Sequence, residues 1–281
     1  MTRRIAPPLS VGIAVWCALA LAPLQSGCQP SVDQHTVASA MQGNTADEQH
    51  VVSVGEKAIP LVFSEMRSHP DAQHWLGAVR LVEAMVNSGT ADDSAPSVRQ
   101  ALRDPHQSTD VRCLAAFLST LYWNSDTVLQ ALTDCGANDR SVRVRVRCTS
   151  SAGTLVSIRA ARKRNWSMDT RLVAFFSSKL KDKDPSVRQA AVDAVCAAAN
   201  SALVEGRVEL PWASSLLSGA KNDPARSVRK AAISALLRLQ QTKRKSLHQH
   251  WGNRGGNRGQ SPVFAEHTPG PPPTTTTRTA G

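Results

Sequence analysis

One amphipathic segment recurs along this chain, and it constrains the fold more than any other feature. Its clearest copy runs over residues 181–199, KDKDPSVRQAAVDAVCAAA. Asp184 suits the N-cap of a helix, and Pro185 suits the first helical position, which needs no N–H donor. From Val187, apolar residues follow at positions i+3, i+4, i+7 and i+8, which is the spacing of one apolar helix face. This segment therefore predicts a helix with one buried side.

Four further segments repeat this pattern, and a shorter segment able to form a helix precedes each copy. The repeated segments are residues 70–79, 108–122, 140–148 and 221–239. Aligned on the Val-Arg dipeptide, or on His74-Trp75 in the faded first copy, the five copies have these anchors: His74, Val111, Val142, Val187 and Val228. The anchors lie 37, 31, 45 and 41 residues apart. Two helices in each period of about 40 residues predict a helical solenoid.

The most specific motif is the run DPSVRQAA at residues 184–191, and the run VGEKAIPLV at residues 54–62 precedes the first copy. Both resemble HEAT repeats, particularly the short bacterial type, and the resemblance covers residues 51–240. It implies an all-α fold, a right-handed superhelical solenoid of paired antiparallel helices with about five repeats. Because one amphipathic pair cannot bury its apolar face alone, stacked neighbours must cover it.

In HEAT repeats, the arginine after the valine often pairs with an aspartate of the turn between the two helices. The resemblance therefore implies that Arg188 pairs with Asp182 or Asp184, and that Arg229 pairs with Asp223. Alternatively, these arginines are solvated charges whose ion pairs contribute less than about 1 kcal/mol to stability. We favour a structural role for them over ligand binding.

The first 27 residues have the parts of an export signal. Two arginines precede an uncharged apolar run at residues 9–24, and this run is short for a membrane span. The ending Ser-Gly-Cys28 resembles the lipobox of bacterial lipoproteins, although that family prefers leucine where Gln25 stands. The resemblance implies cleavage before Cys28 and a lipid on its thiol. We therefore expect an exported protein of the bacterial cell envelope, lipid-anchored to a membrane; an ordinary signal peptide and an uncleaved anchor are the alternatives.

The segments that flank the repeats have other compositions. Residues 28–50 are polar and show no helix or strand period, which predicts a flexible tether. Residues 241–281 are basic and rich in Gly, Pro and Thr, which predicts a disordered tail. The formal net charge of the chain is +11, of which residues 28–240 carry +4. The high charge mainly describes the ends, so it is weak evidence for a nucleic-acid partner.

The stretch RSVRVRVRC at residues 140–148 is the least typical repeat helix. Aligned on Val142, it places Arg145 and Arg147 where the other copies have Leu, Ala, Val or Ile. Either the long arginine stems extend past their neighbours to solvent, or this helix is exposed and contacts a partner. We expect such a contact to use these arginines: Arg143, Arg145, Arg147, Arg159 and Arg162. Replacing Arg145 and Arg147 by alanine would then weaken partner binding and leave thermal stability unchanged or higher.

Motifs of catalysis are absent from the sequence. It has no phosphate-binding loop, dinucleotide fingerprint, zinc-protease helix or nucleophile elbow, and we expect no cofactor. The run His248-Gln249-His250 offers two ligands in a predicted tail, which makes a poor metal site. Of the cysteines in the repeat region, Cys135 and Cys148 flank one turn and are the best candidates for a disulfide. Alternatively, Cys113, Cys148 and Cys196 pack as small apolar residues beside helix faces.

Together, these observations favour a membrane-tethered, non-enzymatic scaffold that binds a protein or peptide along its solenoid surface. The alternative is a nucleic-acid-binding solenoid that uses the basic segments Arg140–Arg147 and Arg159–Arg164. HEAT-like repeats also resemble phycobilin lyases, but no residue beyond the repeat supports an enzymatic function, and a fold alone does not assign an activity.

Overall fold

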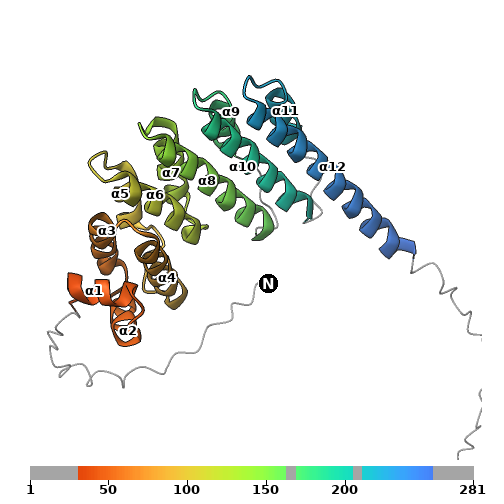
Figure 1. The fold of residues 1–281 in the computed structure, drawn as a ribbon. Coiled ribbons are helices and arrows are strands. Elements are labelled where there is room, and N and C mark those ends of the chain that lie inside the picture. The colour runs from red at the N-terminus through yellow and green to blue at the C-terminus, as the bar shows by residue number, and fades with distance from the viewer. Residues whose placement is uncertain (1–30, 163–168, 205–210, 256–281) are drawn as a thin grey trace, which may run out of the picture. The chain divides into compact units, whose positions relative to one another are not determined.

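The computed structural model describes the backbone of residues 31–162, 169–204 and 211–255, and the side chains as far as residue 246. Every regular element in these residues is a helix (Figure 1). The described residues thus confirm the predicted fold class, an all-α HEAT-like solenoid. The chain divides into two compact units, Met1–Asp92 and Asp93–Gly281. The predicted export signal and Cys28 lie outside the described residues.

The described part of the first unit contains four α-helices and one 3-10 helix. They are α1 (Gln34–Met41), α2 (Thr45–Val54), η1 (Gly55–Ala58), α3 (Ile59–Ser68) and α4 (Ala72–Ser88). Helix α1 packs against the three other α-helices of this unit. Gly77 of α4 permits a close approach, because a Cβ atom there would lie 2.2 Å from the carbonyl oxygen of Met41.

The structure corrects the flexible tether predicted for residues 28–50, because α1 and part of α2 occupy this stretch from Gln34 onward. Val37, Ala40 and Met41 lie at positions i, i+3 and i+4 and are buried. This apolar face is short, and the polar residues around it include the cap Asp33, which accepts a hydrogen bond from the backbone N–H of Thr36. The side chains that cap a helix are polar, so the sequence around the start of α1 has the composition of a tether although it is the start of a helix.

The described part of the second unit contains four helix pairs (Figure 1). The pairs are α5 (Pro96–Arg103) with α6 (Thr109–Leu118), α7 (Asp126–Asn138) with α8 (Val142–Arg162), α9 (Thr170–Lys179) with α10 (Pro185–Val204), and α11 (Pro211–Ala220) with α12 (Arg226–Gly255). The 3-10 helix η2 (Ser119–Tyr122) follows α6. Helices α6, α8, α10 and α12 pack against one another in sequence order, and so do α5, α7 and α9. The pairing predicted from the repeats is confirmed in this unit.

Small residues explain why the long helices approach one another so closely. A Cβ atom at Gly153 of α8 would lie 2.5 Å from the Cβ atom of Ala194 in α10. On α10, Val187, Ala191 and Val195 are fully buried, as their helical spacing predicts. Dense packing of this kind leaves little room for larger side chains at the α8–α10 interface.

The arginine-rich stretch is a helix, but its register differs from the predicted one by two residues. Val144 is fully buried, whereas the predicted anchor Val142 is half-buried. Arg145 donates hydrogen bonds to the carbonyl oxygens of Asp139 and Arg140, six and five residues earlier. Arg188 and Arg229 make the same two contacts with the residues six and five positions before them. Val144-Arg145 is therefore the true counterpart of the other Val-Arg dipeptides.

The last helix is longer than predicted. Helix α12 continues to Gly255, so residues 241–255 do not belong to the disordered tail that the composition predicted. Thr242 donates a hydrogen bond of 2.6 Å to Asn200 of α10, which ties this extension to the helix beside it. The rest of the predicted tail, residues 256–281, lies outside the described residues.

Candidate functional site

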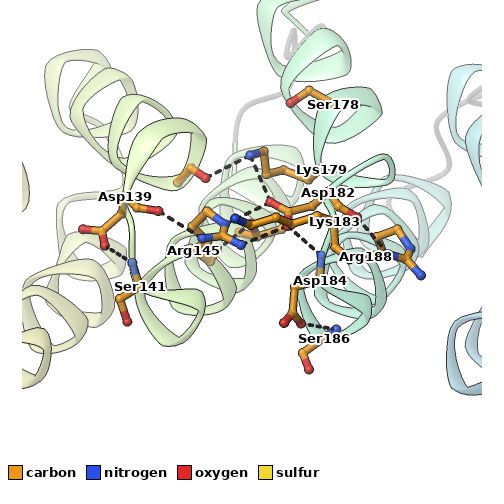
Figure 2. A network of polar contacts seen from close by, with 12 residues as sticks. Asp139, Ser141, Arg145, Ser178, Lys179, Asp182, Lys183, Asp184, Ser186 and Arg188 are labelled. Carbon is orange, nitrogen blue, oxygen red and sulfur yellow. Dashed lines mark hydrogen bonds and ion pairs between the residues drawn. The ribbon is translucent and has the colours of Figure 1, made fainter. Parts of the chain in front are cut away.

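A ladder of buried arginine–aspartate pairs joins successive repeats of the second unit. In the described residues the pairs are Arg112 with Asp139, Arg145 with Asp182, and Arg188 with Asp223. In Figure 2 the guanidinium of Arg145 lies against the carboxylate of Asp182, and both Nε–Oδ2 and Nη2–Oδ1 distances are 3.0 Å. Such bidentate pairs fix orientation as well as distance. The ladder therefore sets the register in which one repeat stacks on the next.

Each ladder aspartate is also held by its own turn. Asp139, Asp182 and Asp223 each accept a hydrogen bond from the backbone N–H two residues later, at distances of 2.7, 3.0 and 2.8 Å. Each ladder arginine in turn donates to carbonyl oxygens of the turn before its helix. A ladder pair thus binds two turns at once, and it satisfies backbone groups that the helix ends leave unpaired.

Burial and ion pairing have opposite effects on the pKa values of the ladder carboxylates. Side-chain exposure is between 3% and 11% for the ladder residues. Hydrogen bonds from Arg188 hold the pKa of Asp223 below its usual range. Burial raises the pKa of Asp182, but hydrogen bonds from Arg145 and from the N–H of Asp184 outweigh burial, so the net pKa is lowered. Both carboxylates are therefore charged at neutral pH.

Lys179 adds a second cation beside the Arg145–Asp182 pair (Figure 2). Its Nζ atom donates a hydrogen bond of 3.0 Å to the carbonyl oxygen of Gly136 and lies 3.7 Å from Oδ2 of Asp182. Burial lowers the pKa of this amine. The lysine thus contacts the preceding repeat as well as its own turn.

The pairing implied by the HEAT resemblance is corrected in one respect. Arg188 pairs with Asp223 of the following turn, whereas Asp182 of its own turn contributes a backbone carbonyl. Asp184 accepts from the N–H of Ser186 at 2.8 Å, as expected for a residue at a helix start. Arg229 donates to the carbonyl oxygens of Asp223 and Pro224, and within the described residues it has no carboxylate partner in a following turn. The structural role predicted for these arginines agrees with these contacts.

The five arginines predicted to contact a partner do not form one surface. Arg145 is 5% exposed and its donors are all engaged in the ladder, so the contact role expected of it is corrected. Arg159 is equally buried in α8, unlike the exposed arginines of this helix. Arg143 is exposed, and its Nη2 atom lies 2.9 Å from Asp110. Arg147 lies over the ring of Phe117 at 5.8 Å and Arg162 over that of Trp123 at 4.9 Å. The nucleic-acid alternative thus loses two cations, and Lys163 and Arg164 lie outside the described residues.

A groove of about 870 Å³ lies between α7 and α9, and sequence reasoning missed it. Its apolar part includes Leu129, Leu172 and Phe175, and its polar part includes these residues: Asp126, Gln130, Thr133, Asp134, Asp169, Arg171 and Ser178. These residues come from two segments that the repeat pattern treats as ordinary packing helices. No local signal marks the groove, because it depends on how two repeats stack.

Arg159 of α8 also lines this groove, and its hydrogen bonds are incomplete. Its Nε atom donates to the carbonyl oxygen of Trp123 at 2.6 Å, and its Nη1 atom donates to Asp126 at 2.8 Å. Its Nη2 atom is buried without a hydrogen-bond partner among the described residues. An unpaired buried donor costs about 1–3 kcal/mol. Because this donor lies beneath the groove surface, an incoming acceptor would satisfy it only if the Arg159 guanidinium turns towards the groove.

Comparison with protein families matches residues 57–257 to the family described as sister chromatid cohesion protein PDS5 protein. The chain belongs to this PDS5 family. The match begins in η1 and includes α3 to α12, so it covers most of the described helices. It supports a HEAT-type helical repeat protein and does not reach the predicted export signal. No curated protein matches the chain.

One further prediction concerns two cysteines of this PDS5-family chain. Cys135 and Cys148 are free thiols, so the proposed disulfide is absent from the described residues. They are nonetheless in contact: a hydrogen bond with Cys135, together with burial, raises the pKa of Cys148 well above its ordinary value. Of the helices that the structure describes, none has the length and apolar character needed to cross a membrane.

Proposed function

We propose that this chain is a non-enzymatic scaffold that binds a peptide segment of another protein in the groove between α7 and α9. The observation that supports this proposal is the buried Nη2 atom of Arg159, which lacks an acceptor beside the apolar surface of Leu129, Leu172 and Phe175. Peptide-binding grooves commonly combine an apolar floor with a few fixed polar groups.

The lining of the groove indicates the chemistry of the peptide. If the Arg159 guanidinium turns towards the groove, it would donate to a backbone carbonyl oxygen of the peptide. A neighbouring apolar side chain of the peptide would cover Phe175. Asp126 and Asp134 are exposed at the rim, where they favour a basic side chain in the peptide.

A peptide-display selection against the full chain tests the proposal. We expect enriched peptides in which an apolar residue is flanked by Lys or Arg. Thr133→Arg places a bulky cation in the groove and should weaken these peptides at least about tenfold, since like charges and lost contacts both oppose binding. Thr154→Arg, on the exposed surface of α8, is the matched control and should bind as the unaltered chain does. Peptides that bind both variants equally, or no enrichment at all, would contradict the proposal.

We also propose that the chain is exported and held at a membrane through a lipid on Cys28. The support is the N-terminal sequence, which combines two arginines, an apolar run and the Ser-Gly-Cys ending. With α1 beginning at Gln34, five residues separate it from Cys28, and five extended residues span at most about 18 Å. The first unit would then lie close to the membrane. A fatty-acid tracer should label the chain and not the variant Cys28→Ala; labelling of that variant would remove this proposal.

The family description names sister chromatid cohesion. We propose a scaffold role for this chain, which a helical repeat supports. We do not propose a role in sister chromatid cohesion, because the N-terminal sequence predicts export.

A further inference from the structure

Two histidines and a buried glutamate meet at the turn between α3 and α4 in the first unit. Glu65 belongs to α3, His69 directly follows its last residue, and His74 lies in the first turn of α4. Nδ1 of His69 lies 2.8 Å from Oε1 of Glu65, and Nε2 of His74 lies 3.7 Å from the same oxygen. The two imidazole rings are nearly parallel, with centroids 4.9 Å apart. Two nitrogens therefore approach one carboxylate oxygen.

A second layer of hydrogen bonds orients this cluster. Oδ2 of Asp71 lies 2.7 Å from Nδ1 of His74, which leaves Nε2 directed towards Glu65. Gln34 of α1 donates a hydrogen bond of 2.6 Å to Oε2 of Glu65, which leaves Oε1 for the histidines. A carboxylate on the far nitrogen of a histidine is the usual outer-layer arrangement of metal sites, because it fixes the tautomer and the ring direction.

We propose that Glu65, His69 and His74 bind a divalent transition-metal ion of the zinc type. One glutamate and two histidines form a ligand set that such ions prefer. The three ligand atoms lie within 4.8 Å of one another. Ligands about 2.0–2.2 Å from a tetrahedral ion are roughly 3.3–3.6 Å apart, so small side-chain rotations would bring the three atoms to that spacing.

The charges and exposure of the cluster favour an ion over a purely structural network. The Glu65 side chain is 5% exposed, and a carboxylate buried to this degree requires a compensating positive charge. Asp71 adds a second carboxylate beside His74, so a cation bound here would face two acidic groups. The His69 side chain is 56% exposed, so an ion bound here would keep a coordination position open to solvent.

Calorimetric titration of the full, chelator-treated chain with Zn²⁺ at pH 7.5 tests the site. We expect one ion per chain, and release at pH 5.5, because histidines bind a metal only when neutral. His69→Ala and His74→Ala should each weaken binding at least about tenfold, and Asp71→Asn about tenfold or more. His106→Ala is a control at an exposed histidine of the second unit. The double variant His248→Ala/His250→Ala removes the other candidate ligands of the sequence.

Three outcomes would overturn the proposal, and the first two are no binding of Zn²⁺ at 100 μM by the unaltered chain and equal binding by the cluster variants. Loss of binding in the His248/His250 variant alone would place the metal at that run and would also overturn it. His74→Ala removes a mostly buried side chain and could prevent folding, whereas His69 is exposed. If His74→Ala does not fold, the result with His69→Ala decides the test. A visible Co²⁺ spectrum that His69→Ala abolishes would provide independent support. The result does not depend on whether the groove binds a peptide.

Discussion

The turn inside a repeat carries different chemistry in the two units of the chain. In the second unit, Asp182 stands six residues before Arg188, and Asp223 stands six residues before Arg229. In the first unit, Trp75 occupies the arginine position, and His69 stands six residues before it. Four residues before these positions, both Asp184 and Asp71 accept hydrogen bonds from the start of the following helix. The position six residues before the arginine therefore holds a ladder aspartate in the second unit and His69 of the Glu65 cluster in the first. We call this turn, with its positions six and four residues before the arginine or Trp75, the shared frame.

This difference indicates that the same position of a repeat can stabilise the fold in one copy and bind a ligand in another. A ladder position is filled on all sides: the carboxylate of Asp182 is bidentate to Arg145 and also accepts from a backbone N–H. The equivalent position at His69 is half open to solvent, and its partners are two more metal-ligating side chains. A fully satisfied buried pair is suited to structure, whereas an incompletely satisfied group is suited to binding.

The largest expected effect on the free energy of unfolding comes from alanine replacements at the two equivalent positions, Asp182 and His69. Asp182→Ala leaves Arg145 buried without its carboxylate, and the free energy of unfolding should fall by about 3–5 kcal/mol. His69→Ala, measured with chelator, removes an exposed side chain and should change it by less than about 1 kcal/mol. Urea denaturation followed by circular dichroism gives both values. Equal losses at the two positions would break the comparison.

The second effect is a pH dependence carried by the ladder. The pKa values of Asp182 and Asp223 are lowered in the folded chain, so their contribution is complete above the unfolded pKa of about 3.9. It is lost as the pH falls from there through the folded values. We expect urea midpoints measured in chelator to fall below about pH 4 in the unaltered chain and to fall less in Asp223→Asn. An unchanged slope in that variant would show that the ladder does not carry the acid sensitivity.

The smallest effect tests the part of the frame that the two units share. Asp184→Ala and Asp71→Ala each remove a side-chain acceptor at a helix start, and each should lower the free energy of unfolding by about 1 kcal/mol in the presence of chelator. Thermal unfolding of the two variants measures this. A much larger loss at one position would mean that the two turns are not equivalent.

Helix positions in the second unit were predictable from the sequence, because apolar periodicity and capping residues are local signals. The ladder register was not, since RSVRVRVRC contains three Val-Arg dipeptides and the periodicity of Val142 fits a helix as well as that of Val144. A signal existed nonetheless. Aspartates stand six residues before Arg188 and Arg229, and the same spacing from Asp139 selects Arg145.

Other features depended on contacts that no local pattern shows. Arg159 looked like a surface cation, yet it is buried because Trp123 and Asp126, more than 30 residues earlier, supply its acceptors. The groove beside it requires the stacking of α7 on α9. The spacing of Glu65, His69 and His74 is visible in the sequence, but it lies in the faded first repeat. Departures from the repeat pattern there indicated only a weakly conserved copy of the motif and not a binding site.

The most direct test of the ladder is a pair of double-mutant cycles within the arginine-rich helix. One cycle joins Arg145 to Asp182, and the other joins Arg143, which is 70% exposed, to Asp110. Alanine replacements and urea denaturation give the coupling energy of each pair. The ladder predicts about 2–3 kcal/mol for Arg145–Asp182 and less than about 1 kcal/mol for the exposed pair. Equal couplings, or a larger one for Arg143–Asp110, would contradict the assignment of Arg145 as the residue that holds successive repeats together.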